Sequence, residues 1–294
     1  GTSAWRLTKL TDYSGKDEII FKYKATSTYE FINPNPSKSS VSANYDYCGR
    51  FTQVLESTSE DPTRYTNFKK LDSIIFKNGF IKFNSSANNR IDDPTNNDLR
   101  LDNIETYSLL NNIPKLIEKQ VFEYEYFEAS SGFDSAEPSL DFRLKLTKIH
   151  RLNEYNIQDK PYEFSYFMDL HFPKRFSFSQ DYWGYFNGKP NASLIPKYQY
   201  TALEGNQFYI GHADRSVDHR FSKEGVIKRI YYPTKGYTDF DFEGNTATIT
   251  SGNTSEQHDV GGLRIKKIIN YDTNGIVKSQ KEYKYFRKNN SNLS

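Results

Sequence analysis

One pattern of residues recurs six times along this chain of 294 residues. Each copy begins with two aliphatic residues separated by two others and continues through a polar or glycine-containing connection. It ends in an alternating segment that usually carries two rings, and repetition of this kind points to one supersecondary unit used many times. The aliphatic pairs are Leu7/Leu10, Leu71/Ile74, Leu101/Ile104, Leu146/Ile149, Ile227/Ile230 and Ile265/Ile268.

The alternating segments are typical of β-strands, because a period of two places every second side chain on the same face. In "KEYKYF" at 281–286, Tyr283 and Tyr285 fall on one face, and Glu282 and Lys284 fall on the other. Turn sequences such as "YSGKD" at 13–17 and "DTNG" at 272–275 stand where hairpins require them. The ring pairs are Phe21/Tyr23, Tyr124/Tyr126, Phe164/Tyr166, Phe240/Phe242 and Tyr283/Tyr285, with Ile81/Phe83 in the less regular second copy.

The composition favours the same fold class, with 23 Tyr, 22 Phe and 2 Trp in a chain poor in alanine. We therefore expect a single all-β domain over 1–294, built as a large, twisted, mainly antiparallel sheet that curls over its ring-lined face. One short helix is expected near 212–223. The six hairpins are predicted within 5–23, 69–86, 99–127, 142–167, 225–243 and 261–286, with insertions at 24–68 and 168–224.

A strip of hairpins leaves an unpaired strand at each end, here near 5–10 and 279–286. Exposed edges can pair with another chain, and lysines oppose such pairing. The second edge carries Lys278, Lys281 and Lys284, whereas the first carries only Arg6 and Lys9. Self-association, where it occurs, is therefore expected through the N-terminal strand.

Charge and apolar runs limit the partners that the chain is expected to have. The 39 Lys and Arg residues nearly balance 37 Asp and Glu residues, so no strong field favours a nucleic acid. No apolar run approaches the roughly 20 residues of a membrane-spanning helix. The sequence contains no Gly-x-Ser-x-Gly, phosphate-binding glycine loop or His-Glu-x-x-His. We expect a protein without catalytic activity and without a cofactor.

The densest aromatic stretch, "DYWGYFNGKPNASLIP" at 181–196, allows two interpretations. In one, its rings pack inward as part of an aromatic wall while Gly184 and Gly188 permit turns, and this interpretation is favoured. In the other, the stretch binds a carbohydrate. The residues of that site would be the stacking rings Tyr182, Trp183 and Tyr185 and the hydroxyl partners Gln180, Asp181 and Asn187.

A second cluster could hold a metal ion, because two histidines and two aspartates lie within eight residues: His212, Asp214, Asp218 and His219. The aspartates would share a helical face at a spacing of four, but the histidines are seven apart and no further ligand is fixed. A solvated helical face is the favoured interpretation, and no metal is expected.

The hairpins resemble a known family. "GGLRIKKIINYDTNGIVKSQKEYKY" at 261–285 is similar to the YD repeat of RHS proteins, with Tyr271-Asp272 and Gly275 in the corresponding places. "IKRIYYPTKGYTDFDFEGN" at 227–245 is similar too. Four segments in matching order resemble large RHS-like surface proteins of Bacteroidota: "SAWRLTKLTDYSGKDEIIFKY", "QDYWGYFNGKPN", "YPTKGYTDFDFE" and "VGGLRI".

This resemblance implies a secreted, cell-surface segment with a structural or adhesive role. Its expected partners are the remainder of a longer RHS-like polypeptide, and a surface glycan or another cell-surface protein. Two other functions stay open: a carbohydrate-binding or glycan-processing domain that uses 180–187, and part of a toxin-enclosing shell. Ser135 and Ser73 lie in tripeptides that look like the O-glycosylation signal of Bacteroidota, Asp134-Ser135-Ala136 and Asp72-Ser73-Ile74.

Overall fold

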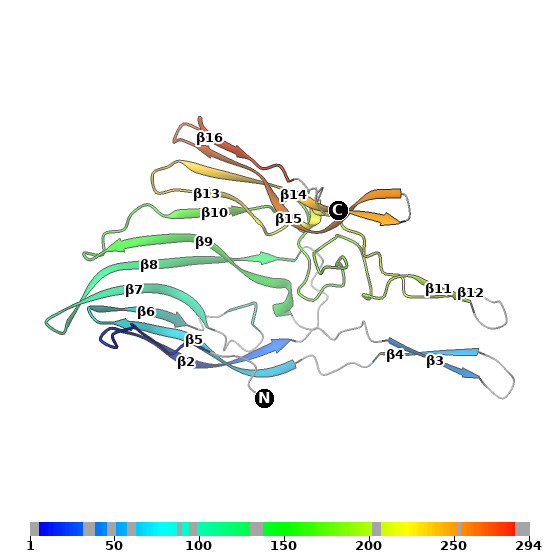
Figure 1. Cartoon of the computed structure of the whole chain (residues 1–294), viewed down its shortest axis with the longest axis horizontal. Helices are drawn as coiled ribbons and strands as arrows, with labels where there is room; N and C mark the ends of the chain where they lie inside the picture. The colour runs from blue at the N-terminus through cyan, green and yellow to red at the C-terminus, as the bar shows by residue number, and fades with distance from the viewer. Residues whose placement is uncertain are drawn as a thin grey trace, which may run out of the picture.

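A computed structural model of the chain contains one sheet of twelve strands, and the strands stand side by side in chain order from the N-terminal to the C-terminal end (Figure 1). The structure describes residues 6–31, 39–45, 51–57, 63–86, 90–93, 99–129, 138–201, 207–251 and 254–285. The strands of the sheet are β1 (Lys9–Thr11), β2 (Glu18–Phe31), β5 (Thr63–Phe76), β6 (Gly79–Ser86), β7 (Arg100–Leu110), β8 (Ile113–Glu128), β9 (Phe142–Asn153), β10 (Tyr162–Tyr166), β13 (Ile227–Tyr231), β14 (Tyr237–Ser251), β15 (Thr254–Tyr271) and β16 (Val277–Glu282).

All six expected hairpins are present as antiparallel pairs: β1–β2, β5–β6, β7–β8, β9–β10, β13–β14 and β15–β16. The all-β prediction is thereby confirmed. Within the expected insertions lie two further strand pairs, β3 (Ser39–Tyr45) with β4 (Phe51–Ser57) and β11 (Tyr198–Thr201) with β12 (Gln207–Ile210). The first insertion is shorter than predicted, because β2 and β5 remain paired as far as Phe31 and Thr63.

A β-bulge explains why the aliphatic residues recur at a spacing of three. Residues three apart in a regular strand point to opposite faces, but one extra residue returns them to the same face. Between β6 and β7, for example, the register moves from Asn84–Asn103 to Ser85–Leu101 and leaves Asp102 as the extra residue. The same shift occurs at all five junctions between hairpins, with the extra residues Asp72, Asp102, Thr147, Lys228 and Lys266.

At the five junctions, the bulge brings the aliphatic pair of one hairpin opposite the closing strand of the hairpin before it. Tyr166, for example, faces Ile227, and Phe164 faces Ile230. The third hairpin presents Phe122 and Tyr124 to the next aliphatic pair, and the second presents Phe83 and Ser85.

A tyrosine hydroxyl links the two strands of four of the six hairpins where their backbone ladder ends. In each case it donates to the carbonyl of the first aliphatic residue of its own hairpin. Burial raises the pKa of Tyr124 and Tyr166, so these phenols stay protonated donors at neutral pH. Phe242 and Ser85 stand at the equivalent position in the other two hairpins. The four bonds are Tyr23 to Leu7 (2.8 Å), Tyr124 to Leu101 (2.8 Å), Tyr166 to Leu146 (2.6 Å) and Tyr285 to Ile265 (2.6 Å).

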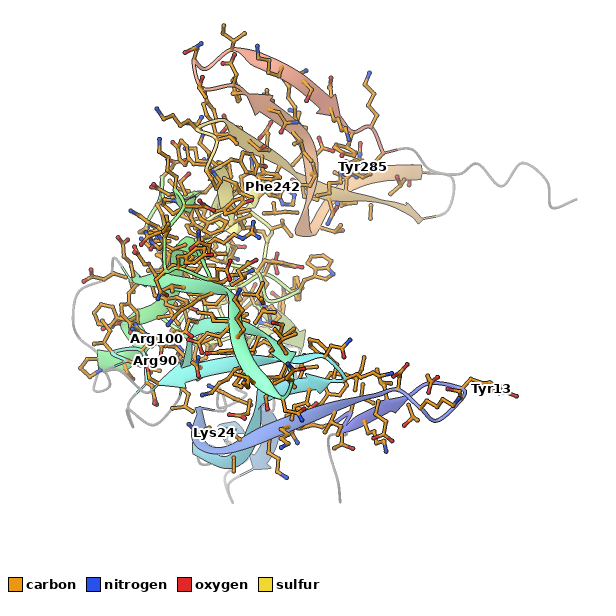
Figure 2. The ribbon with its side chains drawn as sticks, turned by 90° about the vertical axis from the view of Figure 1, so that its left-hand side faces the viewer. Tyr13, Lys24, Arg90, Arg100, Phe242 and Tyr285 are labelled. Carbon is orange, nitrogen blue, oxygen red and sulfur yellow. The ribbon has the colours of Figure 1, made fainter. Side chains whose placement is uncertain are left out.

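The sheet curls strongly, from the hairpin that carries Tyr13 round to the strand end that carries Tyr285 (Figure 2). The curl does not enclose the ring-lined face as expected. Among the described residues only Phe127, Phe172 and Ala213 are buried hydrophobic residues, each with 7–8% of its surface exposed. Most rings of the sheet are half-buried, which leaves the molecule an open sheet with a small core where segment 167–226 meets it.

The helical content is smaller than predicted. A single turn of 3-10 helix, η1, spans Pro138–Asp141, and the α-helix α1 spans only His219–Ser222. Asp218 caps α1, because its side chain accepts a hydrogen bond from the Arg220 N–H at 3.1 Å. The expected helix near 212–223 is therefore wrong over 212–217, which are not helical.

Candidate functional site: the aromatic loop

The segment between β10 and β13 packs against the sheet at two places. At the first, Phe172 stacks on Phe127 of β8 with ring centroids 5.0 Å apart. The Arg143 guanidinium of β9 lies 4.8 Å from the Phe172 ring and donates to the Pro173 carbonyl at 2.5 Å. At the second, Trp183 rests on the backbone of Gly261 in β15, where an added Cβ would lie 2.6 Å from the Trp183 Cβ. These contacts position residues 180–191, which we call the aromatic loop.

Two fully buried side chains hold the aromatic loop in shape. Asp181 Oδ1 accepts the N–H groups of Trp183 at 2.9 Å and Tyr185 at 3.0 Å, which closes an Asx-type turn. Asn187 Nδ2 donates to the carbonyls of Asp214 at 3.0 Å and Ser216 at 2.9 Å. Asp181 and Asn187 were candidates for binding sugar hydroxyls. Because neither is exposed, they cannot meet a ligand in this conformation and instead form the frame of the loop.

Arg215 holds the aromatic loop together, a role that the sequence did not reveal. Its guanidinium donates to the carbonyls of Asp181 at 2.5 Å, Gln180 at 3.1 Å and Leu194 at 3.1 Å. It also lies 5.0 Å from the centroid of the Tyr182 ring, within cation–π distance. No spacing rule links an arginine to carbonyls more than 20 residues earlier, so only the folded structure brings them together. Gln180, the third candidate hydroxyl partner, donates to the Ser177 carbonyl at 2.6 Å.

The rings of the aromatic loop point outward, and the favoured prediction of inward packing is wrong for three of them. Tyr182 is 61% exposed, Trp183 53% and Tyr185 44%. Trp183 packs against Gly261, where an added Cβ would clash with it. The Tyr185 hydroxyl lies beside Gly262, 3.2 Å from the position of an added Cβ. The exposed parts of both rings face solvent. Gly184 and Gly188 both have positive φ angles, 88° and 68°, as their predicted turn role requires.

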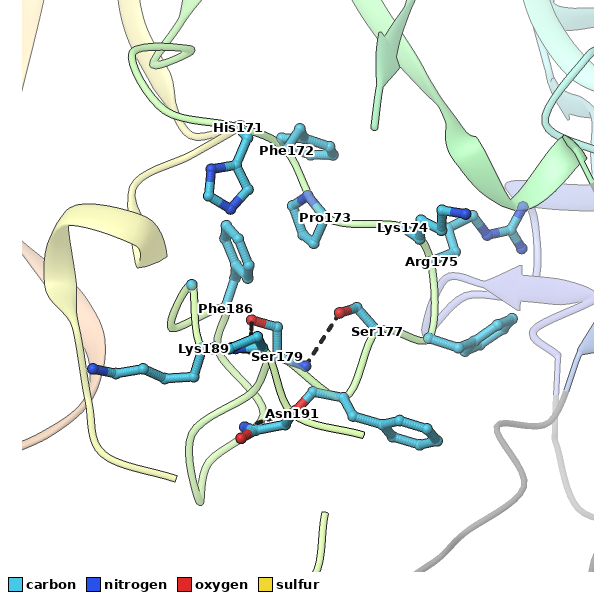
Figure 3. Close-up of a pocket in the computed structure, with 14 residues that line it drawn as sticks. His171, Phe172, Pro173, Lys174, Arg175, Ser177, Ser179, Phe186, Lys189 and Asn191 are labelled. Atoms are coloured by element: carbon cyan, nitrogen blue, oxygen red, sulfur yellow. Dashed lines mark hydrogen bonds between the residues drawn. The ribbon is translucent and has the colours of Figure 1, made fainter. Parts of the chain in front are cut away.

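Phe186 is the ring that turns inward, and it marks one wall of a pocket beside the loop (Figure 3). It packs edge-on against Phe221, with centroids 5.3 Å apart. The pocket has a volume of about 410 Å³ and its lining carries serine, asparagine, lysine and arginine side chains but no carboxylate. Acid–base cleavage of a glycosidic bond uses two carboxylates, and none is among the residues that line this pocket. Its central residues are His171, Pro173, Ser177, Ser179, Phe186 and Asn191.

The four candidate metal ligands serve separate purposes. Asp214 accepts from the Ser216 N–H and hydroxyl, which lowers the pKa of its carboxyl group, and Asp218 caps α1. His219 lies over Gly244, with Nε2 3.7 Å from Asp259 Oδ1, while His212 is exposed. Over the described ranges, no group of three histidine, cysteine or acidic residues could hold a metal ion.

The two candidate O-glycosylation sites differ in what the structure describes. Ser135 lies outside the described residues. Ser73 is 9% exposed on β5, which is paired on both sides, and its hydroxyl donates to Asp72 at 3.3 Å. The low exposure of Ser73 leaves its hydroxyl little access to a modifying enzyme, which argues against modification of the folded chain.

Glu224, just after α1, is expected to make stability depend on pH. Burial raises the pKa of its carboxyl group, and nearby Asp169 raises it further, against the opposing effect of the Leu170 and Asp169 backbone. A pKa above the unfolded value means that stability is greatest below the unfolded pKa and falls as pH rises through the folded pKa. Glu224→Gln should therefore melt higher than the native chain at pH 7 and equally at about pH 4. Thermal melts at both pH values test this. The exposed Glu282→Gln is the control. If the difference in melting temperature between Glu224→Gln and the native chain is the same at both pH values, the prediction is contradicted.

Within the part of the chain that the structure describes, no helix is long and apolar enough to cross a bilayer. The fold and the loop together define an open, antiparallel β-sheet protein that presents an aromatic surface. Comparison of the chain with protein-family models, with curated proteins and with solved structures finds no match.

Proposed function

We propose that this chain is a non-catalytic structural and adhesive segment of a secreted, cell-surface RHS-like protein. One observation carries the proposal: all five junctions between hairpins use the same bulged register, so the sheet is built by repeating one unit. Nearest-neighbour stacking of this kind is how extended repeat scaffolds are assembled. The remainder of a longer polypeptide is the natural partner of such a strip.

A carbohydrate-binding function for the aromatic loop is the second candidate, and the exposure of its rings favours it. Tyr182, Trp183 and Tyr185 offer free aromatic faces on a loop already ordered by buried Asp181 and Asn187. A rigid loop loses little conformational entropy on binding. Exposed rings on a preorganised loop suit stacking against the apolar face of a sugar, and this contact would provide the adhesive role with a surface glycan.

A glycan array tests both functions. We expect selective binding by the native chain, and loss of binding in Trp183→Ala with little change in melting temperature, because Trp183 is half-exposed. Tyr155→Ala, which removes an exposed ring from the connection between β9 and β10 and outside the aromatic loop, should bind as the native protein does.

Glycans eluted from the chain are then analysed by mass spectrometry. Intact glycans agree with a non-catalytic protein, whereas new reducing ends would contradict that proposal. The absence of any binding, or binding that survives Trp183→Ala, would refute the assignment of the aromatic loop.

A further inference from the structure

The outer edge of β1 has the backbone geometry of a strand that receives another hairpin. The Thr8 carbonyl accepts the Phe21 N–H at 2.9 Å, just as the Lys266 carbonyl in β15 accepts the Tyr283 N–H at 2.9 Å. The tyrosine bond to Leu7 likewise repeats the one to Ile265. β15 pairs with β14 on its other side, whereas no described strand pairs with the other side of β1. The edge is therefore preformed, and Leu7 and Leu10 are half-exposed on it.

The five internal junctions show what this edge accepts. At each one, two side chains at the end of one hairpin, separated by a single residue, face the two aliphatic residues of the next hairpin. The single residue that separates them faces the residue two places after the first aliphatic residue. Directly opposite residues lie close enough for their charges to matter. These middle pairs are Lys22–Ser73, Asn84–Asn103, Glu123–Lys148, Ser165–Arg229 and Asp241–Lys267.

None of these five middle pairs brings two like charges together, and two of them pair an acid with a lysine. On the β1 edge the receiving position is Lys9, two places after Leu7, and its ammonium group also forms an ion pair with Glu18 of β2. The closing strand of this same chain carries Lys284 between Tyr283 and Tyr285, so a second copy would place Lys284 opposite Lys9. Like charges directly opposite are destabilising, which disfavours head-to-tail pairing between identical copies.

We propose that the outer edge of β1 is the binding site for the closing strand of another hairpin whose two rings flank an acidic residue. One ring covers Leu10, the other covers Leu7, and the acidic side chain pairs with Lys9. Phe240-Asp241-Phe242 of β14 is an example of this chemistry within the chain. The inference rests on the proposed scaffold function and specifies which strand the scaffold accepts at this edge.

Charge reversal tests the register. Lys284→Glu converts the chain's own closing strand into Tyr-Glu-Tyr, and this variant should associate head to tail by sedimentation velocity, about 10-fold or more tightly than the native chain. Lys9→Glu should associate similarly through Lys284, while the double variant restores like charges and should behave as the native chain does. Lys16→Glu, in the exposed turn between β1 and β2, changes net charge equally and should not associate.

A peptide identifies the occupant. Residues 236–244, "GYTDFDFEG", should bind the native chain in fluorescence anisotropy, and Asp241→Lys in the peptide should weaken binding several-fold. Lys9→Glu in the protein should restore binding of the altered peptide. Equal association of Lys284→Glu and Lys16→Glu, or binding indifferent to the charge at peptide position 241, would overturn the proposal. Neither of these two outcomes bears on glycan binding by the aromatic loop. The β1 edge and the aromatic loop are therefore tested separately.

Discussion

Replacing Phe127 with alanine is expected to lower the free energy of unfolding by about 3–5 kcal/mol. Phe127 is one of the few buried rings, stacked on Phe172 and edge-on to Tyr166 at 5.1 Å. It joins β8, β10 and the segment that carries the aromatic loop, so its loss leaves a cavity where three parts of the fold meet. Urea unfolding followed by circular dichroism measures the change.

Tyr155→Ala is the matched control for this loss of a ring. Tyr155 lies in the connection between β9 and β10 and is exposed, so its removal should change stability by no more than about 0.5 kcal/mol. A cost below about 1 kcal/mol for Phe127→Ala would contradict the placement of the small core at this contact.

Asn187→Ala should be the most damaging single change in the aromatic loop, at about 2–4 kcal/mol. Asn187 is fully buried, and its removal takes the side-chain donor from the Ser216 carbonyl and the acceptor from the Lys189 N–H, which Oδ1 accepts at 3.2 Å, while the Asp214 carbonyl keeps only its bond from Asn191 Nδ2. Each lost hydrogen bond adds to the cost, together with the space left by the buried side chain. Hydrogen exchange should show faster exchange at Lys189 together with the lowered unfolding midpoint.

The exposed Asn274→Ala, in the turn between β15 and β16, controls for loss of an asparagine and should leave the midpoint unchanged. We also expect Asn187→Ala to weaken any glycan binding, because the rings depend on the frame beneath them. Full stability in Asn187→Ala would show that the loop is held by the sheet and not by its own hydrogen bonds.

The hairpins were predictable because their signals are local. Each needs only an alternating segment and a turn, such as Tyr271 to Gly275, and both are visible within about 25 residues. The aliphatic spacing of three was visible too, but not its cause. A bulge depends on the neighbouring strand, as Asp102 depends on the pairing of Ser85 with Leu101.

The candidate site was less predictable because its determinants are distant in sequence. The direction of Trp183 is set by Gly261, 78 residues later, where the missing side chain leaves room for the indole. The burial of Asp181 depends on the loop that Arg215 holds in place. The predicted helix failed at Asp214 for a local reason, since that side chain bonds the Ser216 N–H and leaves helix initiation to Asp218.

The chain-order arrangement of the twelve strands has a mechanical consequence. Each hairpin of the sheet pairs only with the hairpins next to it in the chain, over the residues that the structure describes, and the segment between β10 and β13 adds contacts to β8, β9 and β15. Tension applied at the two ends would load the hydrogen bonds of β1 and β16 one after another and not all together. The molecule would then lengthen in steps, one hairpin at a time, and the hairpins would pair again when the tension falls.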